Sequence, residues 1–412
     1  MNRLLYDIND KPPIKALIVY AIQQLLAVFV ATVLIANICG TPVSSCLVGA
    51  GLATLTYQLV TGFRSPMFIS SCGATCSAVI GALAMSNGNY LAVVIGGIVI
   101  AAVYLILALI VKTGGMEKFN KLFPPTIVGA ITIVIGLNLA TFIPTYVQVN
   151  GDHSNIGILI AIFTMIVTAI SSHYFKGFLK TIPFLIGLAA GYILATICGV
   201  VDWTVFNGVK IFAIPDFATE HFAGFNFDIL AVAVLFIPVA LASAMEHYSD
   251  HKVLSNIIGT DLTTNPGLAN TLAGDGLASL VGTIVCGLPN TSYGESIATT
   301  GFSRVASVRV LTCAAFMIIF LGFIGPVQAF IASIPSCVFG GCAMILYGYI
   351  AASGLKTMKN VDLNDNKNLI VASVVLTVGV SGIWLFNEAF AGVALAMVLG
   401  IILNLILVRK EL

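Results

Sequence analysis

Charged side chains are scarce in this sequence. Only 8% of its 412 residues are Asp, Glu, Lys or Arg, whereas a soluble domain carries about 25%. Apolar residues make up 59% of the chain, and the mean hydropathy is +1.05. This composition cannot cover a water-facing surface, so a soluble globular protein is excluded. We predict an all-α polytopic protein surrounded by membrane lipid, where helices satisfy their own backbone hydrogen bonds.

Other absences narrow the function. The net charge is only +1, so no basic surface predicts nucleic-acid binding. The nine cysteines are odd in number and lie mostly in apolar runs, which argues against disulfides. Cys72 and Cys76 have no second pair of metal ligands, and no GxxxxGKS or GxxxxGKT motif is present, so we expect no metal or other cofactor. No nucleophile–base pair indicates an enzyme.

Two of the apolar segments are unusually short. A spanning helix needs about 20 apolar residues, but the third and tenth segments fall short, and each follows a polar stretch with a proline, Ser65–Phe68 or Pro289–Tyr293. Such segments at matching places in two halves indicate a transporter's binding site. The sequence predicts fourteen spans in all, near 16–36, 44–62, 70–84, 90–111, 126–143, 156–172, 183–200, 227–248, 269–286, 294–304, 308–331, 338–354, 368–385 and 391–407.

The basic residues support this count, because cytoplasmic loops collect Lys and Arg. With the N-terminus inside and fourteen spans, one side of the membrane receives 17 of the 18 basic residues, and only Lys210 falls on the other side. Arg3, Arg409 and Lys410 belong to the larger group. We therefore predict that both termini are cytoplasmic.

A short internal repeat links the two halves. Gly49–Leu55 reads GAGLATL and Gly274–Leu280 reads GDGLASL, at an offset of 225 residues that also aligns Gly62 with Gly287. The match pairs the second segment with the ninth, and a shift of seven segments reverses the orientation. We predict a seven-plus-seven inverted repeat, as in many secondary transporters. The alternative is chance recurrence of small residues at helix contacts.

Acidic residues inside apolar segments are the candidate functional groups, because a carboxylate in hydrocarbon is costly. Glu246 lies in the eighth segment and shares a helix face with Asp250, four residues on, at the end of that segment. A proton shared by two such carboxylates relieves their repulsion, so we assign proton coupling to this pair. Glu295 begins the short tenth segment, where free backbone N–H groups attract polar ligands. The alternative for each glutamate is a structural acid.

Other polar groups are weaker candidates. Asp275 stands where the repeat has Ala50, and we interpret it as holding the ninth segment against a broken helix. His247 and His251 flank the Glu246 region, where packing or a loop position is the simpler interpretation. Tyr347 in the twelfth segment can reach a ligand or bond a helix carbonyl.

Three stretches carry a family resemblance. EHYSD at Glu246–Asp250, NPGL at Asn265–Leu268 and PNTSYGESI at Pro289–Ile297 resemble the nucleobase–ascorbate transporter family, also called nucleobase–cation symporter 2. The likeness runs over nearly the whole chain and points to the bacterial uracil permease branch.

The resemblance implies a core domain of spans 1–4 and 8–11 (residues 1–111 and 227–333) and a gate domain of spans 5–7 and 12–14 (112–226 and 334–412). It implies a short strand before each of half-helices 3 and 10, with the substrate between them, and a homodimer in the plasma membrane. It implies that Glu246, Glu295 and the backbone of Gly294 bind the substrate. Gly73, Tyr293 and Tyr347 complete the predicted substrate-binding set.

The resemblance also implies uptake of uracil with protons. Uracil offers both N–H donors and carbonyl acceptors, and a carboxylate pairs with the N–H groups. Purine-transporting relatives commonly carry glutamine at the position of Glu295, so the glutamate favours uracil over xanthine or urate. Gly73 replaces an aromatic residue of uracil permeases, and Ser296, Ala298 and Ser303 depart from the family signature. The alternatives are a purine permease and an anion transporter of the same architecture.

Overall fold

The computed structural model describes residues 4–122, 124–149, 154–217, 224, 226–385 and 387–408. Arg3, Arg409 and Lys410, which entered the predicted charge pattern, lie outside the described residues. Within them, seven helical stretches are long and apolar enough to cross a membrane, and five shorter apolar helices accompany them.

The helices lie where the apolar segments predict them. Proline begins several of them, as at Pro125 and Pro183, because its fixed φ suits the first turn. The helices are α1 (Ile14–Ile38), α2 (Val43–Val60), α3 (Cys76–Met85), α4 (Leu91–Leu122), α5 (Pro125–Ala140), α6 (Ile143–Tyr146), α7 (Asn155–Tyr174), α8 (Pro183–Ile197), α9 (Ile229–Ile258), α10 (Leu268–Ile284), α11 (Gly294–Ser303), α12 (Val308–Gly322), α13 (Gly325–Ala332), α14 (Ser336–Thr357), α15 (Asn366–Ser381) and α16 (Val393–Val408).

Several boundaries differ from the prediction. Helix α4 continues eleven residues beyond the predicted end of the fourth segment at 111. Helix α9 continues ten residues beyond the predicted end of the eighth segment, so Asp250 lies inside the helix and not at its end. The eleventh segment is two helices, α12 and α13, separated by Phe323 and Ile324. The thirteenth segment stops at Ser381, and a strand pair follows it, β3 (Trp384–Leu385) with β4 (Asn387–Ala391). Helices α9 and α15 each end at a glycine in the left-handed conformation, Gly259 and Gly382, and such C-cap glycines are not reported by apolar composition.

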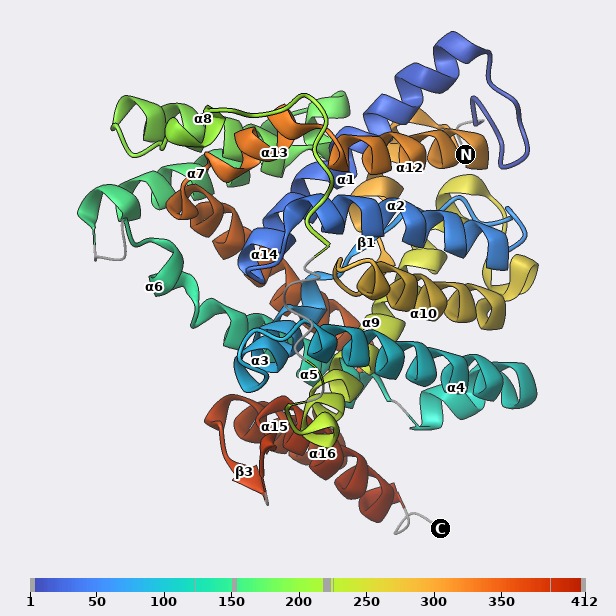
Figure 1. Cartoon of the computed structure of the whole chain (residues 1–412). Coiled ribbons are helices and arrows are strands. Elements are labelled where there is room, and N and C mark those ends of the chain that lie inside the picture. The colour runs from blue at the N-terminus through green and yellow to red at the C-terminus, as the bar shows by residue number, and fades with distance from the viewer. Residues whose placement is uncertain are drawn as a thin grey trace.

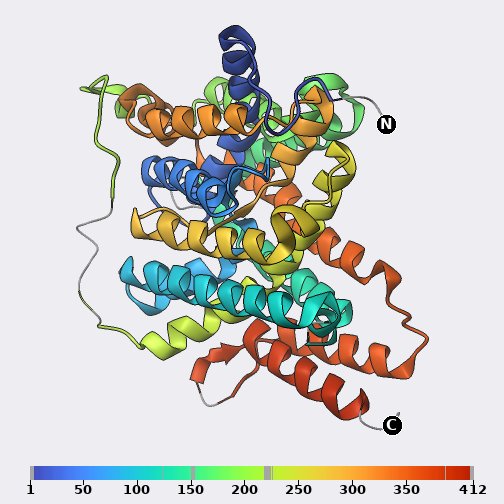
Figure 2. The ribbon, with the colours of Figure 1, turned by 90° about the vertical axis from the view of Figure 1, so that its right-hand side faces the viewer.

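The helices form two packing groups. In one, α12, α2, α10 and α4 lie side by side in that order, as both views show, and α1 packs on α12 (Figures 1 and 2). In the other, α14 packs on α5, α7 and α8, while α15 packs on α5 and α16. Helix α9 contacts members of both groups, which places its polar residues between them.

Small residues let the helices of the first group approach closely. A Cβ added at Gly49 of α2 would lie 3.2 Å from the carbonyl oxygen of Gly282 in α10. A Cβ at Gly274 of α10 would lie 3.0 Å from the Tyr57 ring of α2. A Cβ at Gly51 would lie 2.6 Å from the Ala315 carbonyl oxygen of α12. The two repeat stretches are therefore helix contacts, as small residues are in membrane proteins generally.

Candidate functional site

Two short strands meet at the place where the sequence predicts the broken segments. Strand β1 (Ile69–Ser71) pairs antiparallel with β2 (Asn290–Ser292), and Ser70 lies opposite Thr291. A 3-10 turn (Gly73–Thr75) and α3 follow β1, while α11 follows β2. All six strand residues are buried. Antiparallel pairing places the start of α11 and the start of the turn before α3 at opposite ends of the strand pair.

A cavity of about 540 Å³ lies against this strand pair. Five of the residues predicted to bind substrate line it: Gly73, Glu246, Tyr293, Gly294 and Glu295. Its other side is formed by Leu346, Tyr349 and Ile350 of α14 and by Pro183 and Phe184 of α8. The cavity therefore separates the two packing groups, with acids on one side and mostly apolar side chains on the other.

The two glutamates reach the cavity from different elements. Glu246 is an exposed residue of α9, whereas its neighbours Met245 and His247 are buried. Of these three side chains, only that of Glu246 lines the cavity. Glu295 is half-buried in the first turn of α11. A carboxylate in that turn lies close to unpaired backbone N–H groups, which stabilise negative charge and bind polar ligand atoms. Two carboxylates and backbone donors can together bind a ligand that carries both N–H groups and carbonyls.

The two glycines of the predicted site leave different amounts of room. A Cβ added at Gly294 would meet no atom within 4 Å, so the backbone there faces open cavity. A Cβ at Gly73 would touch the Ile350 Cδ1 atom at 3.4 Å and approach Ile35 and Leu346. The cavity is therefore wide beside α11 and narrow where the turn before α3 faces α14.

Asp250 does not line the cavity but supports a strand that does. The Ser292 hydroxyl donates a 2.8 Å hydrogen bond to the Asp250 Oδ2 atom, and Ser292 itself lines the cavity. Asp250 and Glu246 lie one turn apart on α9, as their spacing predicts. Asp250 is thus linked to the cavity through β2.

A buried contact that the sequence does not reveal joins α9, α10 and β2. His247 Nδ1 lies 2.7 Å from Asp275 Oδ2, and neither side chain is exposed. The Thr291 hydroxyl donates to the same Asp275 oxygen at 2.8 Å. The predicted role of Asp275, holding the ninth segment against the broken helix, agrees with this bond. The simpler interpretation of His247 as a packing or loop residue missed the partner, because nothing in the sequence places Asp275 opposite it.

A second set of buried hydrogen bonds links α9 to Tyr57 in α2 and to Ser65 just after that helix. The His251 Nε2 atom lies 2.7 Å from the Tyr57 hydroxyl oxygen, and that hydroxyl donates to Ser65 at 2.8 Å. The rings of His247 and His251 lie 4.0 Å apart. The two histidines therefore belong to one buried polar cluster behind the strand pair.

Helix α1 contacts both broken segments. The Gln24 side-chain amide donates to the Thr300 hydroxyl of α11 at 3.0 Å, and the Thr32 and Ser70 hydroxyls lie 2.6 Å apart. Sequence analysis does not single out Thr32 or Thr300. Their only signal is a hydroxyl in an apolar segment, and most such hydroxyls bond a carbonyl of their own helix.

Tyr347 is placed differently from the prediction. It is buried in α14 and does not line the cavity, whereas its neighbours Leu346, Tyr349 and Ile350 do. The sequence places a tyrosine in the correct helix but does not give the rotation of that helix. The lining also includes Lys180 and Lys356. The prediction missed them because it used both lysines only as loop charges that set the orientation in the membrane.

Within the part of the chain described by the structure, no group of three or more His, Cys, Asp or Glu residues could hold a metal ion. The polar groups that line the cavity are the carboxylates of Glu246 and Glu295, the ammonium groups of Lys180 and Lys356, backbone groups near Gly294, and hydroxyls.

Apolar helices long enough to cross a membrane, two broken segments paired through short strands, and a cavity with acids beside that pair are the organisation expected of a membrane transporter. Solved structures share this fold: the transmembrane domain of a cyanobacterium bicarbonate transporter, BicA, superposes with a TM-score of 0.64 at 16% identity, covering 94% of this chain and 96% of that one. The inward-facing structure of the murine Slc26a9 anion transporter gives a TM-score of 0.69 at 12% identity, covering 98% and 69%. At such low identity the likeness concerns the fold alone.

The chain belongs to the Permease family, whose sequence model matches residues 15–388. It is similar to the uracil permease of Bacillus caldolyticus, with 36% identity over 99% of this chain and 95% of the relative. It is also 35% identical to the uracil permeases of Bacillus subtilis and Escherichia coli. The first alignment covers 98% of this chain and 95% of the relative, and the second covers 98% and 94%.

Proposed function

We propose that this chain is a proton-coupled nucleobase symporter that takes up uracil across the plasma membrane. One observation carries the proposal: Glu246 and Glu295, from two different elements, line one cavity at the crossing of β1 and β2. The uracil permeases to which the chain is similar over nearly its full length support the same substrate.

The chemistry of the cavity suits a pyrimidine-dione. Each carboxylate accepts hydrogen bonds from ring N–H groups, and backbone N–H groups at the start of α11 can donate to ring carbonyls. The open space at Gly294 lets the edge of a flat ring approach the backbone. Glu295, at the start of α11, is assigned to the recognition of the base.

Proton coupling is assigned to Glu246 and Asp250. Glu246 faces the cavity, where Glu295 is a second carboxylate, and Asp250 lies one turn away behind β2. Titratable groups on the elements packed around them are Asp275 of α10, His247 and His251 of α9, and Tyr57 of α2. Placing several carboxylates together is unfavourable unless one holds a proton. Binding of substrate and of a proton at Glu246 can thus support each other.

The proposed architecture has fourteen spans in an inverted repeat. The contacts support the repeat. At the offset of 225 residues, Gly274 is the position equivalent to Gly49, and Gly282 is the position equivalent to Tyr57. The contact of Gly49 with Gly282 thereby becomes the contact of Gly274 with Tyr57, and both contacts are present. Reciprocal contacts of this kind are expected when two repeats are related by a twofold axis.

The two packing groups support a core domain of residues 1–111 and 227–333 and a gate domain of residues 112–226 and 334–412. The charge pattern assigns Lys180 and Lys356, which line the cavity, to the cytoplasmic side. We therefore interpret the conformation as open toward the cytoplasm, with both termini on that side.

We also propose a homodimer, because the family resemblance implies one.

A purine permease is the second candidate, because Gly73 stands where the resemblance gives uracil permeases an aromatic residue. Ile350 keeps the cavity narrow at this point, since it lies 3.4 Å from a Cβ added at Gly73. An anion transporter is the third, since the solved structures of this fold include a bicarbonate transporter and an anion transporter. Glu246 and Glu295 disfavour an anion on their side of the cavity by direct repulsion, whereas Lys180 and Lys356, which also line the cavity, attract one, so the uptake assay decides.

Uptake assays with radiolabelled uracil separate these candidates. We expect uracil to accumulate, with more uptake at pH 5.5 than at pH 8 and little competition from excess xanthine. Strong competition by xanthine would favour the purine permease, and uptake of bicarbonate without uracil would favour the anion transporter. Accumulation that survives collapse of the proton gradient would reject the symport mechanism.

A further inference from the structure

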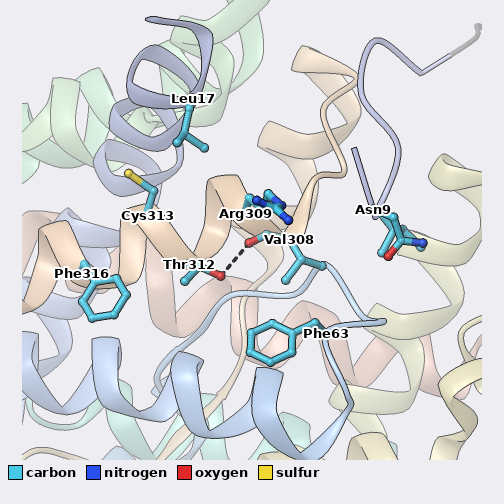
Figure 3. Close-up of a pocket in the computed structure, with 9 residues that line it drawn as sticks. Asn9, Leu17, Phe63, Val308, Arg309, Thr312, Cys313 and Phe316 are labelled. Atoms are coloured by element: carbon cyan, nitrogen blue, oxygen red, sulfur yellow. Dashed lines mark hydrogen bonds between the residues drawn. The ribbon is translucent and has the colours of Figure 1, made fainter. Parts of the chain in front are cut away.

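A second cavity, of about 580 Å³, lies away from the substrate cavity on the outer side of α12. We call it the α1–α12 groove, and its defining residues are Leu17, Phe63, Arg309, Thr312, Cys313 and Phe316. Figure 3 shows Leu17 and Phe63 on either side of the start of α12, with Cys313 and Phe316 farther along that helix. No residue of this groove takes part in the proposed transport site.

The N-terminal segment forms a fixed wall of the groove, which Ile8 and Asn9 also line. Leu5 donates its N–H to the Arg304 carbonyl at 2.8 Å, and Ala306 donates its N–H to the Tyr6 carbonyl at 2.8 Å. The N–H of Val308 donates to the Ile8 carbonyl at 3.1 Å. The groove is therefore formed by paired backbone and does not need a ligand to order its wall.

The α12 side of the groove is one helix face. Arg309, Thr312, Cys313 and Phe316 follow the spacing i, i+3, i+4 and i+7, which places their side chains in one row. Phe316 is 59% exposed and Phe63 is 44% exposed, so both rings offer apolar surface. At 1.5 Å per residue, Phe316 lies about 10 Å along the helix axis from Arg309.

Arg309 is the cation of the groove. It is exposed, and within the described residues it forms no ion pair, although Asp7 and Asp10 lie in the neighbouring N-terminal segment. The Asp10 Oδ2 atom accepts the backbone N–H of Asp7 instead. The Thr312 hydroxyl is already used, because it contacts Gln58 at 2.7 Å and the Val308 carbonyl at 3.0 Å (Figure 3). One guanidinium is thus free to pair with an anion.

We propose that the α1–α12 groove binds one anionic phospholipid. Its phosphate pairs with Arg309, because a guanidinium matches the oxygens of a phosphate. One acyl chain follows the row of Cys313 and Phe316 toward the membrane interior. The order along α12, first a cation and then exposed apolar side chains, matches the order of head and tail in a phospholipid. Arg309 lies on the side that the charge pattern assigns to the cytoplasm, where anionic lipids attract basic residues.

Native mass spectrometry and melting curves of the purified chain test this site, with phosphatidylglycerol and phosphatidylcholine as probes. We expect the wild-type chain to retain phosphatidylglycerol in preference to phosphatidylcholine. Arg309→Gln should weaken phosphatidylglycerol retention about tenfold, and Arg309→Lys should keep part of it. Cys313→Trp, which fills the groove, should remove both lipids. Lys359→Gln is the matched control, since it loses one positive charge outside the groove.

Several results would overturn the proposal. One is equal phosphatidylglycerol retention by Arg309→Gln and wild type, and another is equal retention of both lipids by wild type. Equal stabilisation by glycerol 1-phosphate would indicate a site for free phosphate. A changed oligomeric mass in Cys313→Trp would indicate that a second copy of the chain covers the groove. The melting temperature of Arg309→Gln in phosphatidylcholine should equal that of wild type, which shows that the variant folds. If it is lower, the retention of phosphatidylglycerol by Arg309→Lys is compared with wild type instead.

Discussion

His247 Nδ1 lies 2.7 Å from Asp275 Oδ2, and both side chains are fully buried. The same carboxylate oxygen accepts the hydroxyl of Thr291 in β2. One carboxylate therefore joins α9, α10 and the strand that leads into Glu295. A buried polar group is costly unless it is hydrogen-bonded, so removing one member of this contact leaves the other unsatisfied.

Asp275→Asn should destabilise the fold strongly. The asparagine can still accept from Thr291, but the carboxylate contact with His247 is lost, and a buried polar group left without its partner costs about 1–3 kcal/mol. Melting curves of the purified protein in detergent measure the effect.

Asp202→Asn, in an exposed loop, is the control for this change and should melt like wild type. The double variant His247→Gln with Asp275→Asn should recover part of the loss, because it replaces both partners by neutral groups. If Asp275→Asn alone melts like wild type, the contact does not hold the three elements together.

Ser292→Ala should lower uracil uptake about fivefold, because one hydrogen bond of roughly 1 kcal/mol between β2 and Asp250 is lost. Ser292→Thr keeps the hydroxyl and should retain most activity. Ser249→Ala removes a hydroxyl from an exposed position beside Asp250 on α9, and it should behave as wild type. Equal initial rates for Ser292→Ala and Ser249→Ala would show that the bond does not support transport.

Glu246→Gln should abolish concentrative uptake. The amide has nearly the same shape but cannot take up or release a proton, so the proton gradient no longer drives accumulation. Steady-state uracil levels in cells with a defined proton gradient provide the measurement, and wild-type accumulation in this variant would defeat the assignment.

Glu295→Gln is the companion change, because it alters recognition of the base and leaves Glu246 in place. It should still accumulate substrate while becoming more sensitive to competition by xanthine. If Glu246→Gln and Glu295→Gln have the same defect, the two glutamates do not have the separate roles proposed here.

Gly294→Ala and Gly51→Ala should separate binding from folding. At Gly294 the new methyl group enters open cavity, so the KM for uracil should rise while the melting temperature stays unchanged. At Gly51 the methyl group would lie 2.6 Å from the Ala315 carbonyl oxygen of α12, and overpacking of this kind costs about 1–3 kcal/mol. A melting temperature that falls equally in both variants would contradict the open space at Gly294.

Much of the fold follows from apolar segments and from breaks between them. The stretches around Pro66 and Pro289 predict interrupted segments, and the strands β1 and β2 lie there. Intramembrane position selects Glu246, Glu295 and Asp275; the two glutamates line the cavity, whereas Asp275 is buried outside it. The end of α9 escapes this reasoning because the helix continues through polar residues such as His251 and Lys252 as far as Ile258. The break between α12 and α13 escapes it because apolar residues lie on both sides.

The sequence by itself determined that the chain is a helical membrane protein, which segments break, and which acids lie inside the apolar spans. These properties follow from the cost of placing polar groups in lipid, which composition and position alone report. Only the tertiary structure decided that His247 meets Asp275, that Asp250 bonds Ser292 of β2, and that Tyr347 is buried outside the cavity lining. A helix that is apolar all round carries no pattern showing which face meets which neighbour, so packing between distant segments sets these contacts.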